Sequence, residues 1–111
     1  MPYVENDNKY QNLIVLCKAN GCWELNEKLA KIVGLEFNKI KSLIPEELKK
    51  AIAEEDVLFR YWATCLALAV LEEEFKDKLN EWYLLAAKAN EFLVSYEPNV
   101  KYYKDCAKNV K

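Results

Sequence analysis

Histidine is absent from this chain of 111 residues, and glycine and proline are scarce, with two and three copies. Without histidine, the chain lacks the side chain that most often serves as a general base near neutral pH. The shortage of turn residues argues against β-sandwiches and β-barrels, which need many tight turns. No glycine-rich loop that could hold a phosphate group is present. We therefore expect a helical protein that is not an enzyme and that binds no cofactor.

Basic clusters and long apolar segments are also missing. The net charge is −2 and lysines alternate with glutamates, whereas nucleic-acid binding depends on a clustered basic surface. The longest uncharged run, 61–71, is much shorter than the about 20 residues of a membrane-spanning helix. Residues 1–8 are polar and do not resemble a signal peptide. These features predict a cytoplasmic protein without a nucleic-acid or membrane partner.

The four cysteines are Cys17, Cys22, Cys65 and Cys106. In an oxidising compartment they could form two disulfides. Cys65, however, lies within an apolar helical run, where cysteine acts as a small hydrophobic residue. A zinc site would need paired short spacings, and the chain has no CxxC motif and no histidine. We expect reduced thiols and no bound metal.

Neighbouring acidic residues, at 54–55 and 72–74, could supply a pair of catalytic carboxylates. No pocket motif accompanies them, so solvated helix faces are the better explanation. Cys22 lies in a predicted turn, but no histidine is present to activate its thiol. The sequence thus favours a binding function over catalysis.

Apolar periodicity divides the chain into helical segments. Asn26 is a good N-cap for a short helix that Gly34 would end, and Asp77 is placed to cap a later, long helix. We predict an all-α fold over residues 1–111, a single domain formed by a compact bundle of five to six helices around a buried central helix. The helical segments fall at about 7–19, 26–34, 35–44, 45–52, 55–75, 77–96 and from 98 onward.

The segment 55–75 is the best candidate for the central helix, since it contains no glycine or proline. Between Trp62 and Leu71 only Thr64 is polar, and a helix that is apolar on every side is a buried helix. Tryptophans can also serve as exposed hot spots for a partner, but their helical spacing among apolar neighbours favours core positions. The predicted structural core comprises Trp23, Trp62, Leu66, Leu68 and Trp82.

Aromatic residues near the C-terminus exceed what a short terminal helix needs for docking. A partly exposed, aromatic-rich surface is typical of a protein–protein interface. The alternative is that these side chains pack along the outer seams of the bundle, and the inner face of segment 77–96 is expected to include both Leu79 and Tyr83. The candidate partner-binding residues are Phe37, Tyr83, Tyr96, Tyr102 and Tyr103.

Two sets of residues carry a family resemblance. The first reads G-C-W-E-L at 21–25, followed by L-A at 29–30 and G-L at 34–35. The second extends from W-A-T at 62–64 to the leucine at 93, through apolar pairs and the E-W pair at 81–82. Their order is similar to the C-terminal helical domain of proteins that carry vault-protein-inter-alpha-trypsin and von Willebrand A domains. Vault poly(ADP-ribose) polymerase ends in a related domain, and the resemblance covers about 17–93.

The resemblance implies a protein–protein interaction module. In its sharpest form, it implies that the domain binds major vault protein and targets an attached host protein to vault particles. The alternative is a structural or self-associating helical end-domain of a larger protein of the same family. A helical bundle that binds a small molecule is a third reading. Any enzymatic activity would then belong to another domain of a longer protein.

Overall fold

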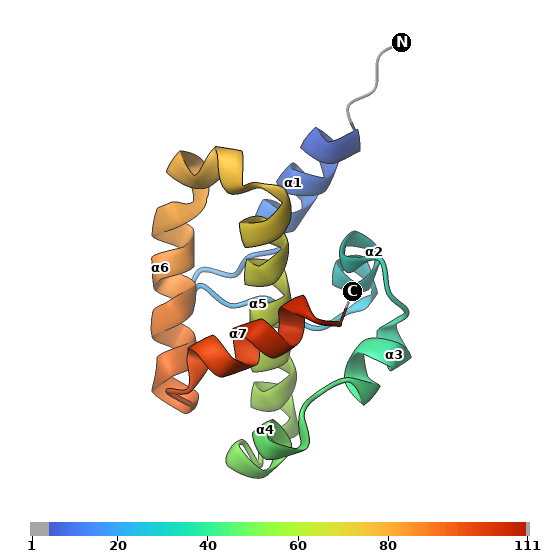
Figure 1. Cartoon of the computed structure of the whole chain (residues 1–111), viewed down its shortest axis with the longest axis vertical. Coiled ribbons are helices and arrows are strands. Elements are labelled where there is room, and N and C mark those ends of the chain that lie inside the picture. Colours follow the sequence, from blue (N-terminus) through green and yellow to red (C-terminus); the bar gives the residue numbers. More distant parts are fainter. Residues whose placement is uncertain (1–4, 111) are drawn as a thin grey trace.

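The computed structural model describes residues 5–110, and these residues form seven α-helices and a short 3-10 helix, with no β-strand among them (Figure 1). The all-α prediction is confirmed. The seven α-helices exceed the predicted bundle of five to six, but they correspond to the seven helical segments expected from the periodicity, including the three short ones within residues 26–52. The elements are α1 Glu5–Val15, α2 Glu27–Val33, α3 Phe37–Ser42, α4 Glu46–Ala51, α5 Glu55–Glu74, η1 Lys76–Lys78, α6 Leu79–Tyr96 and α7 Val100–Lys108.

Helix α5 is the buried centre of the fold, as predicted. It runs lengthwise through the molecule, and α7 crosses its middle (Figure 1). Every residue of the run 61–71 is buried, including Thr64, the one buried polar residue of the described chain. The five predicted core residues, Trp23, Trp62, Leu66, Leu68 and Trp82, are all buried.

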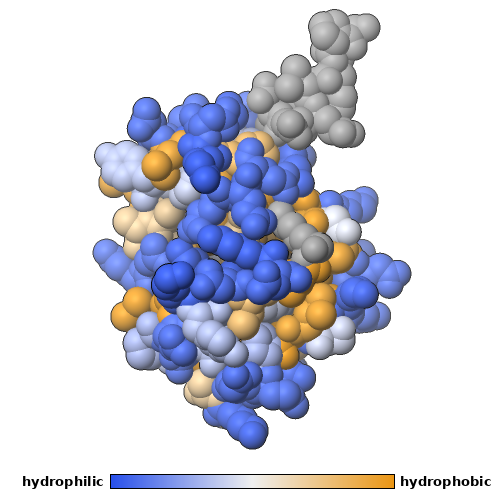
Figure 2. Space-filling view, viewed as in Figure 1, coloured by the Kyte–Doolittle hydropathy of each residue, from blue (hydrophilic) through white to orange (hydrophobic). Residues whose placement is uncertain are grey.

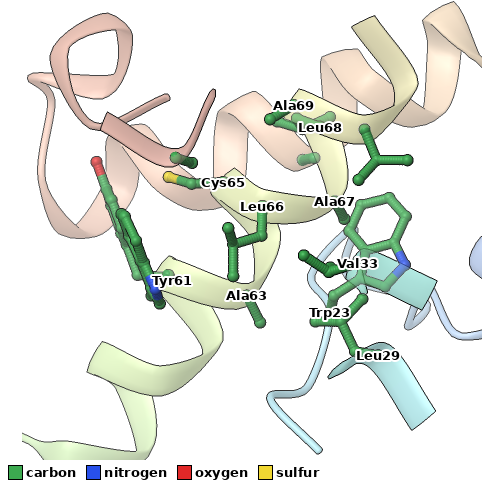
Figure 3. Close-up of a cluster of buried hydrophobic side chains, with 14 of the residues drawn as sticks. Trp23, Leu29, Val33, Tyr61, Ala63, Cys65, Leu66, Ala67, Leu68 and Ala69 are labelled. Carbon is green, nitrogen blue, oxygen red and sulfur yellow. The ribbon is translucent and has the colours of Figure 1, made fainter. Parts of the chain in front are cut away.

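Alanines on α5 let its neighbours approach closely. Ala63 and Ala67 are fully buried, and the close-up shows Trp23 and Val33 lying on their side of the helix (Figure 3). Tyr61 points to the other side, where its hydroxyl donates a hydrogen bond of 2.8 Å to a backbone carbonyl of the α6–α7 corner. Close packing of small residues on one side and a large aromatic on the other fixes how the outer helices sit on α5.

Each of the three tryptophan indoles forms a hydrogen bond with the end of a helix. The last carbonyls of a helix lack partners within it, and a buried indole N–H needs an acceptor. The three N–H groups donate to carbonyls in or directly after the last turns of α1, α3 and α5. These bonds run from Trp23 to Leu13 (2.8 Å), from Trp62 to Ile40 (3.2 Å) and from Trp82 to Phe75 (2.8 Å).

The predicted ends of α2 are confirmed. The side chain of Asn26 accepts a hydrogen bond of 2.9 Å from the backbone N–H of Leu29. Gly34 ends the helix with φ of +87°, and its N–H donates to the carbonyl of Ala30 over 2.8 Å. A side-chain acceptor at the start and a left-handed glycine at the end are the local signals that make such boundaries readable from sequence.

The predicted ends of α1 and the cap of α6 are wrong. Helix α1 runs from Glu5 to Val15, whereas 7–19 was expected. After it, the N–H of Leu16 is shared between the carbonyls four and three residues back, and the N–H of Cys17 donates only three residues back, to Ile14 (3.1 Å). Asp77 does not cap α6 but lies within η1, and no side chain caps α6. The reason is tertiary, because the carbonyl of Phe75 accepts from both Lys78 N–H (3.0 Å) and the indole of Trp82 (2.8 Å). These two bonds tighten the turn after α5.

None of the helices described in residues 5–110 combines the length and the apolar character that crossing a bilayer requires.

Candidate interaction surface

Exposed apolar side chains concentrate on α6. Among the described residues, five of the seven large hydrophobic side chains that are well exposed belong to this helix, led by Leu84 at 69% exposure. Only three of its 18 residues are charged. Large exposed apolar areas on soluble proteins mark interaction sites. The five residues are Leu79, Tyr83, Leu84, Val94 and Tyr96.

One face of α6 attaches it to the core. Its fully or nearly buried residues are Trp82, Ala89 and Leu93, whose spacing places them on one side of a helix. Leu79 and Tyr83 are turned away from the middle of that side and are 47% and 54% exposed, so their predicted inner positions are wrong. The pattern of apolar residues on α6 is wider than the face that the core covers.

Gly21 brings the loop before α2 against the backbone of α6. It adopts φ of +90°, and a Cβ atom at this position would lie only 2.8 Å from the backbone carbon of Lys88. The loop that carries Gly21 is closed by two bonds, from its N–H to the carbonyl of Lys18 (2.9 Å) and from Lys18 N–H to the carbonyl of Cys22 (2.8 Å). Backbone therefore packs on backbone at this point of α6.

One line of residues along the flank of α6 carries no charge. Leu79, Tyr83, Ala87, Asn90 and Val94 are separated by four, four, three and four positions, which places them along a single helix face. All are exposed except Asn90, which is half-buried. We call this line the α6 stripe. Apolar and weakly polar atoms recur along the left edge of the molecule, over α6, in Figure 2.

The predicted partner-binding residues do not form one surface. Tyr83 and Tyr96 are both exposed on α6, but 13 helical residues separate them by about 20 Å along the axis. Phe37 is half-buried on α3, across the molecule from α6 (Figure 1), and its ring lies 5.2 Å from the ammonium of Lys41. Tyr102 is exposed on α7, where its hydroxyl donates to Glu47 over 2.9 Å.

Tyr103 is a core residue, and its prediction as a partner-binding residue is wrong. It is only 4% exposed and packs edge-to-face on Tyr61, with ring centroids 6.0 Å apart. Neighbouring helix positions point about 100° apart, so when α7 docks on α5 only one of Tyr102 and Tyr103 can remain outside. The sequence analysis missed Leu84, Ala87 and Val94 as surface residues, although the low charge of the helix was a signal for them.

A bridged carboxylate attaches α7 to the end of α5. The carboxylate of Glu72 accepts from Lys104 over 2.9 Å and from Lys108 over 2.8 Å. Burial raises the pKa of Glu72, but the hydrogen bonds from Lys108 and Lys104 outweigh it and leave the pKa below its usual value. The same bond raises the pKa of Lys108. This cluster of one carboxylate between two ammonium groups holds α7 against the end of α5.

The cysteines are thiols without an activating partner. Burial raises the pKa of Cys17 to about 11 and also raises the pKa of Cys22 and Cys65. A raised thiol pKa means little thiolate at neutral pH and hence a weak nucleophile. Within the described residues, no group of three or more histidine, cysteine or acidic side chains could hold a metal ion.

The surface also has shallow grooves. In the one with the most charged lining, of about 380 Å³ beside Asn90 and Lys104, the carboxylate of Glu72 is already bridged by two lysines. One of about 350 Å³ lies between α1 and α2, where Val15 and Lys28 line it; another of about 720 Å³ lies beside Trp82 and Lys76. In the described part of the chain, every buried side-chain nitrogen and oxygen has a hydrogen-bond partner. An active site usually keeps a reactive group poised in a pocket. The α6 stripe is therefore the strongest candidate site.

Comparison with known proteins relates the chain to von Willebrand factor A domain-containing proteins. It is 40% identical over 83 residues to human von Willebrand factor A domain-containing protein 5A, which covers 75% of this chain and 10% of that protein. The mouse protein of the same name is 39% identical over 83 residues, again 75% of this chain and 10% of its own length. A Dictyostelium discoideum protein, von Willebrand factor A domain-containing protein DDB_G0286969, is 28% identical over 97 residues, 82% of this chain and 4% of its own.

The chain thus spans about a tenth or less of the curated relatives it matches. No family model matches it, and no solved structure matches it. The similarity supports the von Willebrand A part of the resemblance seen in the sequence. It gives no support for the relation to the vault polymerase domain.

Proposed function

We propose that this chain is a protein-interaction domain within a larger protein of the von Willebrand A type, and that it docks through the α6 stripe. The largely exposed and uncharged character of that stripe carries the proposal. The similarity to a segment of much longer proteins supports a role beside other domains. An end-domain that associates with its host or with a copy of itself fits both observations.

Catalysis has no support in this domain. The sequence contains no histidine, and burial raises the pKa of three of its four thiols. The carboxylate with the most buried surroundings, Glu72, is bridged by two lysines. We therefore assign the domain a binding role and leave any chemistry to other parts of a host protein.

Major vault protein is a narrower candidate partner. Its support is limited to the motif resemblance over about 17–93. The distinctive residues of those motifs, such as Trp23, Trp62 and Ala67, are buried in the structure. Buried motif residues specify how helices pack, and they carry no information about which partner the surface meets. Binding to major vault protein is accordingly an outcome for the experiment below.

Affinity capture with quantitative mass spectrometry tests the proposal. The bait is the tagged domain in three forms: unchanged, with Leu79→Glu and Val94→Glu together, and with Val15→Glu as a control. Val15 is the most exposed large apolar side chain and lies on α1, away from α6, so its substitution adds one charge without touching the proposed face. We expect stoichiometric partners that the double variant loses and the control keeps. Identical captured sets for all three baits would contradict the proposal.

A further inference from the structure

We infer that the α6 stripe pairs with the same stripe of a second copy of this chain, with the two helices antiparallel about a two-fold axis beside Ala86 and Ala87. This inference rests on the proposed function, because it names the occupant of the same face. A two-fold interface requires a surface that is complementary to itself when reversed. The stripe meets that requirement residue by residue.

The stripe reads alike in both directions. Measured from the midpoint between Ala86 and Ala87, Leu79 and Val94 are equally distant, and so are Tyr83 and Asn90. Antiparallel pairing therefore sets an aliphatic residue against an aliphatic residue at both ends of the contact. It sets alanine against alanine at the centre.

The sizes of the side chains suit this arrangement. Two alanines at the centre allow the helix axes to come as close as about 8 Å, the lower end of the usual range. Larger residues toward the ends then fill the space that opens as the helices diverge. Ala87 is exposed and Ala86 half-buried, so both are accessible to a neighbouring helix from the stripe side.

Tyr83 and Asn90 supply a polar match between the two copies. In the described part of the chain, the hydroxyl of Tyr83 and the side-chain amide of Asn90 have no hydrogen-bond partner. The reversed register brings each tyrosine opposite the asparagine of the other copy. A phenol and an amide can each donate and accept, so the pair can be satisfied on both sides of the axis.

The charges are compatible with the same register. Glu81, Lys88 and Glu91 lie off the stripe, so no charged residue of α6 lies on it. The charges beside the stripe belong to α7, whose Lys101 and Lys104 line a groove with Asn90. Antiparallel helices also set the positive end of one helix dipole beside the negative end of the other.

The length of α6 sets the strength of the contact. Its 18 residues extend for about 27 Å, and one helix pair of that length buries less than the about 1,200 Å² of a stable interface. We therefore expect weak pairing of the isolated domain, with a dissociation constant of about 10–100 μM. Within a multidomain protein, other contacts would raise the effective concentration and strengthen the pairing.

Engineered cysteines test the register directly. Three single variants are compared under mild oxidation at about 100 μM, the unchanged chain serving as the baseline for the native thiols. In Ala87→Cys, the two new sulfurs lie beside the axis. In Asn80→Cys, antiparallel pairing would hold the two new sulfurs about 20 Å apart, whereas parallel pairing would bring these sulfurs together. Ser95→Cys places the new sulfur on α6 but turned about 120° from the stripe.

We expect the Ala87→Cys dimer to form at least about tenfold faster than the dimers of the other two variants, as read on non-reducing gels. Fast linkage through Asn80→Cys would overturn the antiparallel arrangement, and equal rates for all three would overturn the pairing itself. Thermal unfolding of each variant shows that the fold is kept. If pairing fails while the capture experiment still finds α6-dependent partners, the proposed function stands and its occupant is another protein.

Discussion

The backbone N–H of Trp23 donates a hydrogen bond of 3.0 Å to the hydroxyl oxygen of Thr64, which lies at the centre of α5. The same hydroxyl donates to the carbonyl of Arg60, one turn earlier, over 2.7 Å. Thr64 is therefore the polar link between the central helix and the loop before α2. Because the indole of Trp23 also bonds to Leu13, this link helps to position the loop and α1 together.

Thr64→Val should destabilise the fold by about 1–3 kcal/mol, because the N–H of Trp23 would be buried without an acceptor. The substitution keeps the shape of the side chain, so a cavity does not contribute. Thr64→Ser is the matched control, since it keeps the hydroxyl and loses one methyl group, worth about 0.8 kcal/mol. Urea titration gives both free energies of unfolding. A valine variant as stable as the serine variant would show that this hydrogen bond is unimportant.

Gly21→Ala should cost more than Gly34→Ala, although both glycines have φ near +90°. A Cβ atom at Gly21 would meet the backbone of Lys88 at 2.8 Å, whereas nothing lies within 4 Å of one at Gly34. We expect about 1 kcal/mol for Gly34→Ala, from the left-handed backbone alone. For Gly21→Ala we expect more than about 2 kcal/mol, since α6 must also move. Equal losses of unfolding free energy for the two variants in urea titration would mean that the loop shifts to make room for the Cβ atom and that α6 stays in place.

The Glu72 bridge should contribute stability that acid removes. The native pKa of Glu72 is lowered, so its contribution is complete above the unfolded value of about 4.3 and is lost as the pH falls through the native pKa. Glu72→Gln should therefore cost about 1 kcal/mol at pH 7 and almost nothing at pH 3. Thermal unfolding of both proteins at the two pH values measures this. If the variant were still less stable than the unchanged protein at pH 3, the loss of stability would come from packing and not from the ion pairs of Glu72.

Local signals made part of the fold readable from sequence. The run 61–71 is apolar on every side, so its burial follows from composition alone. Asn26 and Gly34 act through hydrogen bonds to their own helix, and those boundaries were predicted correctly. The turn after α5 was not predicted correctly, because its geometry depends on a hydrogen bond from the indole of Trp82, which lies on α6. A tertiary hydrogen bond leaves no trace in the local pattern.

The interaction surface was harder to predict for a related reason. Periodicity shows that α6 has a broad apolar side, but it does not show how much of that side the core covers. The core covers the side that carries Trp82, Ala89 and Leu93 and leaves Leu79 and Tyr83 outside. Tyr102 and Tyr103 are equally aromatic in sequence, and only the docking of α7 separates the exposed one from the buried one.

Backbone amide chemical shifts recorded at rising protein concentration test the central claim most directly. Spectra of the ¹⁵N-labelled domain are recorded at protein concentrations between about 20 μM and 1 mM, a range that includes the expected dissociation constant. The account predicts that concentration-dependent shifts centre on residues 79–94 of α6, and that Ala87→Glu abolishes them by placing two like charges at the axis. Val15→Glu should leave them unchanged. Shifts centred on the groove between α1 and α2, or no shifts at all, would contradict pairing through α6.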